Sequence, residues 1–159
     1  MSVLSKAYGL SVLRIGWVAC QDARLTGRIV AFRQYLSVCS AGPSKMLAYI
    51  ALKGTNAITG RNRNLADMNL LLLQAMLARH LALFGWAVRD GGMVGYARHG
   101  GTGGADRFVL CMAEEACVLV LPASVFRSDL VPLPPAWFRI GFGQAGIRAG
   151  LAAMETALR

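Results

Sequence analysis

Acidic side chains are scarce in this chain of 159 residues, where eight Asp and Glu stand against 17 Lys and Arg and the net charge is +9. Only 16% of the residues are charged and 55% are hydrophobic, a composition too apolar for a disordered tail. Long apolar runs are also missing, because uncharged runs such as residues 68–78 and 116–126 fall short of the ~18–20 residues that a membrane-spanning helix needs. Lys6 is followed by glycine and Arg14 instead of an apolar segment, so no signal peptide is predicted. We therefore expect a soluble, cytoplasmic, globular chain.

Clustered metal ligands and catalytic pairs are missing too. The cysteines are Cys20, Cys39, Cys111 and Cys117. Because they show no CxxC spacing and no neighbouring pair of histidines, the sequence predicts neither a zinc site nor a disulfide framework, and four buried free thiols are expected. His80 and His99 each stand alone, and no GxxxxGKS/T phosphate loop is present. No metal site and no P-loop nucleotide site are therefore predicted.

The basic excess has two interpretations. A net charge of this size is typical of nucleic-acid-binding proteins. The arginines, however, are scattered from Arg14 to Arg159 and form no dense run. The second interpretation is that the chain is part of a larger polypeptide whose acidic portion is missing from it.

Hydrophobic periodicity predicts the elements of the first half. Residues 14–20 (RIGWVAC) are a short apolar run typical of a buried strand. Asp22 is placed to cap an amphipathic helix over residues 23–36. Ser44 is expected to cap a helix that ends near Lys53. A longer helix is predicted from about Asn64 to His80, with its apolar face formed by Leu65, Met68, Leu72, Met76 and Leu77.

The second half mixes helices with short strands. Residues 86–89 and 93–97 flank the pair Asp90–Gly91, a strong hairpin signal because such a turn needs positive φ. The further predicted elements are a loop at 100–104, a helix at 105–116, a buried strand at 117–121, an extended segment at 128–135, a strand at 137–142 and a helix at 146–158. This alternation predicts an α/β or α+β fold.

Lys6 and Arg14 are the first candidate site residues. Lys6 lies next to the predicted buried strand, an unusual place because lysine prefers a solvated surface. A desolvated lysine loses proton affinity, and its neutral amine attacks a carbonyl carbon to form a Schiff base. Arg14 follows eight residues later and offers a planar fork that binds phosphate. The alternative interpretation of the same residues is an ordinary flexible N-terminus.

Arg139 is the second candidate. The period of two along residues 137–142 puts Phe138, Ile140 and Phe142 on one face of a strand. Arg139 lies on the opposite face, where it can bind a carboxylate through two parallel hydrogen bonds. A solvated residue on the sheet surface is the alternative.

These segments, in this order, resemble the C-terminal half of the class I and II aminotransferases, enzymes of fold type I that use pyridoxal 5′-phosphate (PLP). LSKAYGL at residues 4–10 and LRIGW at 13–17 resemble the lysine motif of that family. VLVLP at 118–122 and FRIGFG at 138–143 resemble its C-terminal end. SAGPS at 40–44 suggests the branch that includes capreomycidine-synthase-like enzymes. The resemblance covers essentially the whole chain.

The resemblance implies roles for three residues. Lys6 would be the Schiff-base lysine that holds PLP and then moves the proton at the substrate Cα. Arg14 would bind the PLP phosphate, and Arg139 would bind the α-carboxylate of an amino acid or a 2-oxo acid. Val3 departs from the family, which usually has a phosphate-binding serine at that position.

The resemblance also implies a domain organisation. Residues 1–21 would end the PLP-binding large domain, 22–80 would form connecting helices and 81–159 an α+β small domain, in a parent enzyme that is commonly a homodimer. In this family most of the large domain, with its other contacts to the PLP ring, precedes the lysine and is not among these residues. The apolar surface at residues 14–20 is therefore expected to be exposed.

The sequence thus predicts the C-terminal fragment of a PLP-dependent aminotransferase. A non-catalytic remnant and the partner-dependent half of a split enzyme are the alternatives of the same family. A small basic nucleic-acid-binding module is the alternative from a different class, and no membrane partner is expected.

Overall fold

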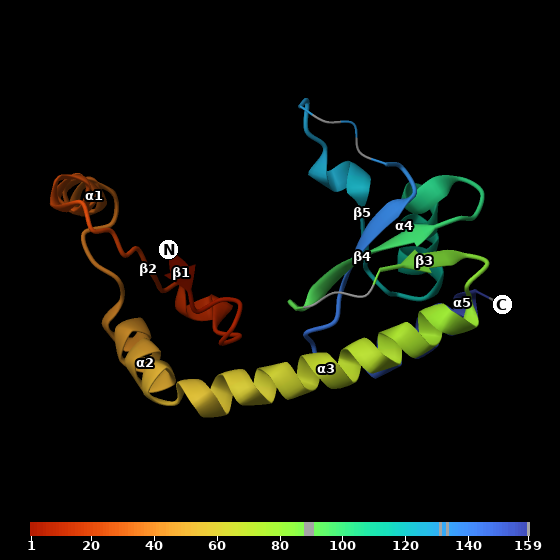
Figure 1. The fold of residues 1–159 in the computed structure, drawn as a ribbon, viewed down its shortest axis with the longest axis horizontal. Coiled ribbons are helices and arrows are strands. Elements are labelled where there is room, and N and C mark those ends of the chain that lie inside the picture. The colour runs from red at the N-terminus through yellow and green to blue at the C-terminus, as the bar shows by residue number, and fades with distance from the viewer. Residues whose placement is uncertain (88–90, 131, 133, 159) are drawn as a thin grey trace. The chain divides into compact units, whose positions relative to one another are not determined.

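The computed structural model describes residues 1–87, 91–130, 132 and 134–158. The chain divides into two compact units, Met1–Arg63 and Asn64–Arg159, and the boundary between them falls within one long helix, α3 (Thr55–Arg79). Figure 1 follows the elements of both units along the chain. Among the described residues, no helix is both long enough and apolar enough to cross a membrane.

A small β-ribbon opens the first unit. β1 (Ser2–Val3) pairs antiparallel with β2 (Gly16–Trp17), and the loop between them contains a 3-10 turn, η1 (Ser11–Leu13). The strand predicted over residues 14–20 is therefore only two residues long. Its predicted burial is wrong, because Trp17 is 42% exposed. Trp17 and Val18 instead form the exposed apolar surface that is expected for a fragment.

Helix α1 (Ala23–Leu36) has the bounds that the sequence predicts. Asp22 caps it as expected, since its Oδ1 accepts hydrogen bonds from the N–H groups of Arg24 (2.8 Å) and Leu25 (3.2 Å). A cap of this kind contributes about 0.5–2 kcal/mol of helix stability. None of the residues of α1, all of which are described, is buried.

Helix α2 (Gly42–Lys53) ends where the sequence predicts but begins earlier. Its N-cap residue is Ala41, and Ser44 lies inside the first turn, so the predicted Ser44 cap is wrong. Pro43 explains the earlier start, because its fixed φ and missing N–H suit the first positions of a helix.

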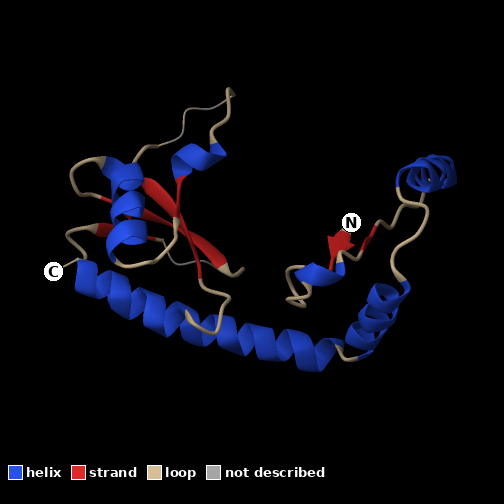
Figure 2. Ribbon diagram, turned by 180° about the vertical axis from the view of Figure 1, so that it is seen from behind, coloured by secondary structure: helices blue, strands red, loops and turns tan. Residues whose placement is uncertain are grey.

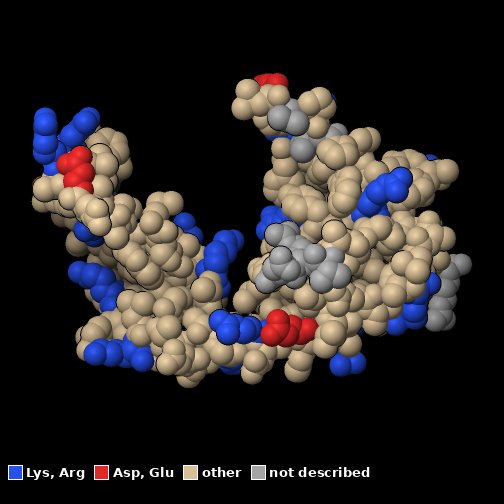
Figure 3. All heavy atoms as spheres, in the orientation of Figure 1, with Lys and Arg blue, Asp and Glu red and all other residues tan. Residues whose placement is uncertain are grey.

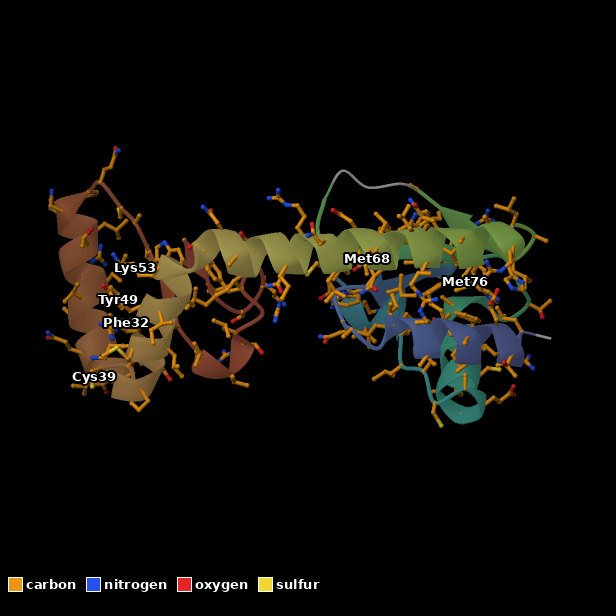
Figure 4. All side chains as sticks on the ribbon, turned by 90° about the horizontal axis from the view of Figure 1, so that it is seen from below. Phe32, Cys39, Tyr49, Lys53, Met68 and Met76 are labelled. Carbon is orange, nitrogen blue, oxygen red and sulfur yellow. The ribbon has the colours of Figure 1, made fainter. Side chains whose placement is uncertain are left out.

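Helix α3 starts at Thr55, well before the predicted start near Asn64, and its buried face also differs from the prediction. Met76 is fully buried as expected, whereas Met68 is 61% exposed; both are labelled in Figure 4. The buried residues of α3 are Asn62, Ala66, Asn69, Leu73, Met76 and Leu77. The run of four leucines at 70–73 places apolar side chains all round the helix, so the sequence alone did not fix which side is buried.

The second unit is an antiparallel sheet with the strand order β3–β4–β6–β5 (Figure 2). The strands are β3 (Phe84–Trp86), β4 (Val94–His99), β5 (Leu121–Pro122) and β6 (Trp137–Gly141). The other elements are α4 (Gly104–Glu115), the 3-10 helix η2 (Ala123–Phe126) and α5 (Ile147–Ala157). Helix α4 packs on β4, β5 and β6, and α5 packs on α4. The mixed α/β content is confirmed.

The core of the second unit confirms the predicted alternation along β6. Phe138, Ile140 and Phe142 are all buried. The Phe138 ring packs against the rings of Phe84 and Phe108, with centroid separations of 6.0 and 5.0 Å. These aromatic contacts join β3, α4 and β6 into one hydrophobic cluster.

The predicted hairpin is present with different bounds. β3 and β4 pair antiparallel over Phe84–Trp86 of β3, and residues 88–89 of the predicted first strand lie outside the described residues. Asp90, the first residue of the predicted turn, lies outside the described residues. The positive φ is at Gly92 (+89°) and not at Gly91.

The buried strand predicted at residues 117–121 is also wrong. Cys117 has a left-handed φ of +53° that redirects the chain after α4, and only Leu121–Pro122 form the strand. The cysteines are free, but the predicted burial is wrong for them: Cys20, Cys39 and Cys117 are exposed and Cys111 is half-buried. Among the described residues, no group of three or more His, Cys, Asp or Glu could hold a metal ion.

Candidate functional site

Lys6 lies on the loop between β1 and β2, and its side chain is exposed. The desolvated surroundings expected for this lysine are therefore wrong, because the strand beside it is exposed as well. Its backbone C=O accepts a hydrogen bond from the N–H of Gly9 (3.0 Å), and Gly9 has the positive φ (+68°) that glycine adopts without strain. Leu4 is fully buried, and its N–H donates to the C=O of Ile15 (3.1 Å), which closes the loop. The backbone around Lys6 therefore has a defined path although the side chain faces solvent.

Two hydrogen bonds fasten this loop to the first turns of α3. Asn62 is buried and donates through Nδ2 to the C=O of Ala7, the residue after Lys6 (2.9 Å). The hydroxyls of Tyr8 and Thr55 form the second bond (3.0 Å). Sequence reasoning missed these residues, because the partners are 55 and 47 positions apart and no local spacing links them.

Arg14 ends the η1 turn, with a left-handed φ of +52° and an exposed side chain. Lys6 and Arg14 thus belong to one loop of the first unit. Asp22 is the only acidic residue among residues 1–63, and its carboxylate already caps α1. Within the described residues no carboxylate lies at ion-pair distance from either cation. Two cations without a counter-ion on one loop suit an anionic group such as a phosphate.

Arg139 lies on β6, in the second unit, on the sheet face opposite Phe138. It is half-buried, and its register partner on β4 is Tyr96. The Arg139 Cζ lies 5.6 Å from the centre of the Phe126 ring, and the rings of Tyr96 and Phe126 meet edge to face at 6.3 Å. No described carboxylate pairs with Arg139. The guanidinium therefore lies over the Phe126 ring, with no described carboxylate to neutralise it, and can receive an anion.

Tyr96 and Phe126 were missed by the sequence analysis. They lie 43 and 13 positions before Arg139, and only the pairing of β4 with β6 brings Tyr96 beside it. A cation over an aromatic face gains about 0.5–1 kcal/mol at an exposed site. The Phe126 ring thus restricts the guanidinium without neutralising its charge, and the Tyr96 ring packs on Phe126.

Asn69 of α3 fixes the end of β6. Its side chain is buried, and Nδ2 donates to the C=O groups of Phe142 and Gln144, both at 2.8 Å. The strand that carries Arg139 is thereby held at its C-terminal end by a side chain, in addition to its ladder with β4.

His99 is buried and predicts a pH dependence of stability. Its ring stacks on Phe108 (centroids 4.4 Å apart), and burial lowers the pKa of His99 below its ordinary value of 6.5, an effect that a hydrogen bond to the backbone of Gly104 opposes. The unfolded chain therefore binds this proton more readily than the folded chain. The free energy of unfolding should be highest above about pH 6.5 and fall as the pH drops below it.

The prediction is tested by measuring the free energy of unfolding in urea at several pH values between about 5 and 8. His99→Phe should flatten the dependence. His80→Gln is the matched control and should keep it, because this variant removes the other histidine and leaves His99 stacked on Phe108. An unchanged slope in His99→Phe would contradict the assignment.

Comparisons with known proteins converge on one family. The family model described as "Aminotransferase class I and II" matches residues 1–153. Capreomycidine synthase from Streptomyces vinaceus is 30% identical over 161 residues, which cover 98% of this chain and 39% of that protein.

Solved structures give the same result. A PLP-dependent aminotransferase from Streptococcus suis 89-1591 superposes with a TM-score of 0.85 at 26% identity, covering 98% of this chain and 40% of that one. The N-succinyldiaminopimelate aminotransferase from Mycobacterium tuberculosis has a TM-score of 0.80 at 22% identity, covering 97% of this chain and 40% of its own, and shows the fold alone. This chain thus spans about 40% of the length of the relatives that it matches.

Proposed function

Because this chain belongs to the class I and II aminotransferase family, we propose that it supplies three site residues of a PLP-dependent transamination of amino acids. Lys6 is the covalent lysine, Arg14 binds the cofactor phosphate and Arg139 binds the substrate carboxylate. The observation that carries the proposal is the pair of cations, Lys6 and Arg14, on one hydrogen-bonded loop with no carboxylate beside them in the described residues.

The chemistry of these side chains fits part of the cofactor. PLP presents an aldehyde and a phosphate dianion, which match an amine and a guanidinium. Val3 is the mismatch, since an alkyl side chain cannot donate the hydrogen bond that a serine would give to the phosphate. When bound, PLP supplies an electron-withdrawing ring that stabilises the charge left on the substrate Cα.

Each residue has a separate task. Lys6 would hold the cofactor through its Nζ, and its free amine would carry the proton to and from the substrate Cα. Arg14 binds the phosphate through the parallel N–H groups of its guanidinium. Arg139, whose guanidinium lies over the Phe126 ring, orients the substrate through its α-carboxylate.

The activity itself belongs to the assembled fold, because this chain spans only about 40% of its relatives. We further propose that residues 1–21 form the end of the cofactor-binding domain and residues 81–159 form the small domain. Residues 22–80 form the helices that connect these two domains, and the parent enzyme is a homodimer. Amino acids and 2-oxo acids are the proposed substrates. The free cysteines support a cytoplasmic location.

Arg139→Lys tests the carboxylate role. A suitable protein is a chimera in which this chain replaces the matching segment of the Streptococcus suis aminotransferase. A lysine keeps the charge but loses the two-pronged contact, so kcat/KM for the amino acid should fall by about 10–100-fold. The measurement is the rate of 2-oxo-acid formation against amino-acid concentration.

Arg98→Lys is the matched control. Arg98 is an exposed arginine of β4, two residues from Tyr96 and on the same sheet face. Its replacement should leave kcat/KM within about 2-fold, since exposed surface substitutions have small effects. Equal losses in both variants would refute a specific role of Arg139.

A further inference from the structure

Asn62 of α3 is a buried polar residue beside the loop that carries Lys6 and Arg14. Its exposed fraction is 8%, and among residues 1–63, all of which are described, no other polar or charged residue is buried. Burying an amide is costly unless its oxygen and nitrogen find hydrogen-bond partners. The partners of Asn62 therefore indicate what this position contributes to the loop.

The hydrogen bonds of Asn62 fix the orientation of its amide. The Oδ1 atom accepts from the neighbouring Arg61, through Nε at 3.4 Å and Nη2 at 3.2 Å. The Nδ2 atom donates to the backbone C=O of Ala7 at 2.9 Å. Because a guanidinium only donates and a carbonyl only accepts, the reverse orientation of the amide would break both contacts. Asn62 thus holds the backbone of the residue that follows Lys6.

The second bond between the loop and α3 has a defined direction. Thr55 donates its hydroxyl hydrogen to the C=O of Leu52 (2.6 Å), so in its bond with the hydroxyl of Tyr8 (3.0 Å) the tyrosine is the donor. Thr55 and Asn62 are seven positions apart, which is about two helical turns and nearly the same face of α3. Ala7 and Tyr8 are therefore both anchored to one face of this helix.

The backbone decides where the amine of Lys6 lies, because its side chain is exposed. Inside the loop, the N–H of Gly9 donates to the C=O of Lys6 (3.0 Å), and the N–H of Leu10 donates to the C=O of Leu4 (3.0 Å). The C=O of Ala7 has its partner outside the loop, in Asn62. Removing that donor therefore frees the peptide next to Lys6 while the other two bonds remain.

A neutral donor also suits the charge of this unit. Residues 1–63 contain nine Lys and Arg and a single acid, and Figure 3 shows basic side chains over α1 and α2. An aspartate at position 62 would have the shape of asparagine, but its carboxylate would repel the C=O of Ala7 instead of donating to it. It would also add a negative charge next to the loop that carries Lys6 and Arg14. The asparagine holds the loop and leaves both cations to an anionic ligand.

We propose that Asn62, oriented by Arg61, is a positioning residue for Lys6. Its amide fixes the turn so that the Lys6 amine reacts with an aldehyde whose phosphate is bound by Arg14. The inference rests on the proposed function, because it takes Lys6 as the lysine that reacts with PLP. It adds the residue of α3 on which the selective reaction of this lysine depends.

The test treats the purified chain with PLP and borohydride and measures the ratio of label on Lys6 to label on Lys45 and Lys53. Asn62→Leu removes the donor without adding charge and should lower this ratio at least about 5-fold. Asn62→Asp keeps the shape, loses the donor and should lower it at least as much. Asn64→Leu and Asn64→Asp are the matched controls, because Asn64 is exposed and lies on a different face of α3. They should leave the ratio within about 2-fold.

Two further measurements separate positioning from a general loss of structure. In Asn62→Leu, hydrogen exchange should speed up at the amides of Gly9 and Leu10 but not along α2, which shows that the unit stays folded. In the Streptococcus suis chimera, the same substitution should lower kcat and leave KM for the amino acid within about 2-fold, since Arg139 is unchanged. If Asn62→Leu does not fold, the isosteric Asn62→Asp is used for the same measurements.

Three results would overturn the inference. The first is an unchanged label ratio in both Asn62 variants while the unmodified chain prefers Lys6, which leaves the proposed function standing. The second is an equal loss in the Asn64 variants, or faster exchange along the whole unit in both Asn62 variants, which would show a general structural effect. The third is no preference for Lys6 in the unmodified chain, which would contradict the proposed role of Lys6 as well.

Discussion

Replacing Lys6 with alanine in the Streptococcus suis chimera should lower the rate of transamination by at least about 10²–10⁴-fold, the range that a positioned acid–base group contributes. In the proposed function, the side chain lost is both the covalent anchor of the cofactor and the group that moves the proton at the substrate Cα. The loss should appear mainly in kcat, because Arg139, the proposed ligand of the substrate carboxylate, is unchanged. The measurement is steady-state kinetics at saturating PLP.

Lys53→Ala is the control for this prediction. Lys53 lies on α2 with its ammonium 5.5 Å from the centre of the Tyr49 ring (Figure 4), an ordinary surface contact. Its removal should change the rate by less than about 2-fold. A Lys6→Ala chimera that keeps more than a tenth of the rate would show that another group performs the proton transfer.

Phe138→Ala should destabilise the second unit by about 3–5 kcal/mol, the range for removing a buried phenylalanine ring. Phe138 is fully buried at the centre of the cluster that joins β3, α4 and β6. Its removal leaves a cavity between the rings of Phe84 and Phe108. A loss of this size is a large part of the free energy of unfolding of a small domain. Urea unfolding followed by circular dichroism measures it.

Phe32→Ala is the matched change at an uncovered position. Phe32 is 63% exposed on α1, so the free chain should lose no more than about 0.5 kcal/mol. If the two substitutions cost the same, the packing described for the second unit would be wrong.

Where local chemistry decides the structure, the sequence was sufficient. Asp22 identifies the start of α1 because a short acidic side chain accepts the first free N–H groups of the helix. The alternation along β6 identifies Phe138 as core and puts Arg139 on the other face. Both features depend on neighbours within a few residues.

Where packing decides, the sequence was not sufficient. The leucine run of α3 fits more than one helical face, so Met68 was assigned to the core although it is exposed. Cys117 was placed in a buried strand because its neighbours are apolar, but a left-handed residue there turns the chain. The burial expected for residues 14–20 needs more neighbouring strands than β1, which is the partner that β2 has among the described residues.

In the candidate site, too, short motifs could be recognised in the sequence, whereas long-range contacts could not. Lys6, Arg14 and Arg139 were identified from short motifs, and their roles remain proposals. The contacts that hold their backbones, such as Asn62 to Ala7, join segments far apart in the chain and leave no local signal.

The most direct test of the whole account is to incubate the purified chain with PLP, reduce it with borohydride and locate the modified lysine by peptide mass. The chain has three lysines, Lys6, Lys45 and Lys53. The account predicts that the phosphopyridoxyl group is found predominantly on Lys6, where Arg14 on the same loop attracts the phosphate, and that Arg14→Ala removes this preference. Label spread evenly over the three lysines, or none on Lys6, would contradict it.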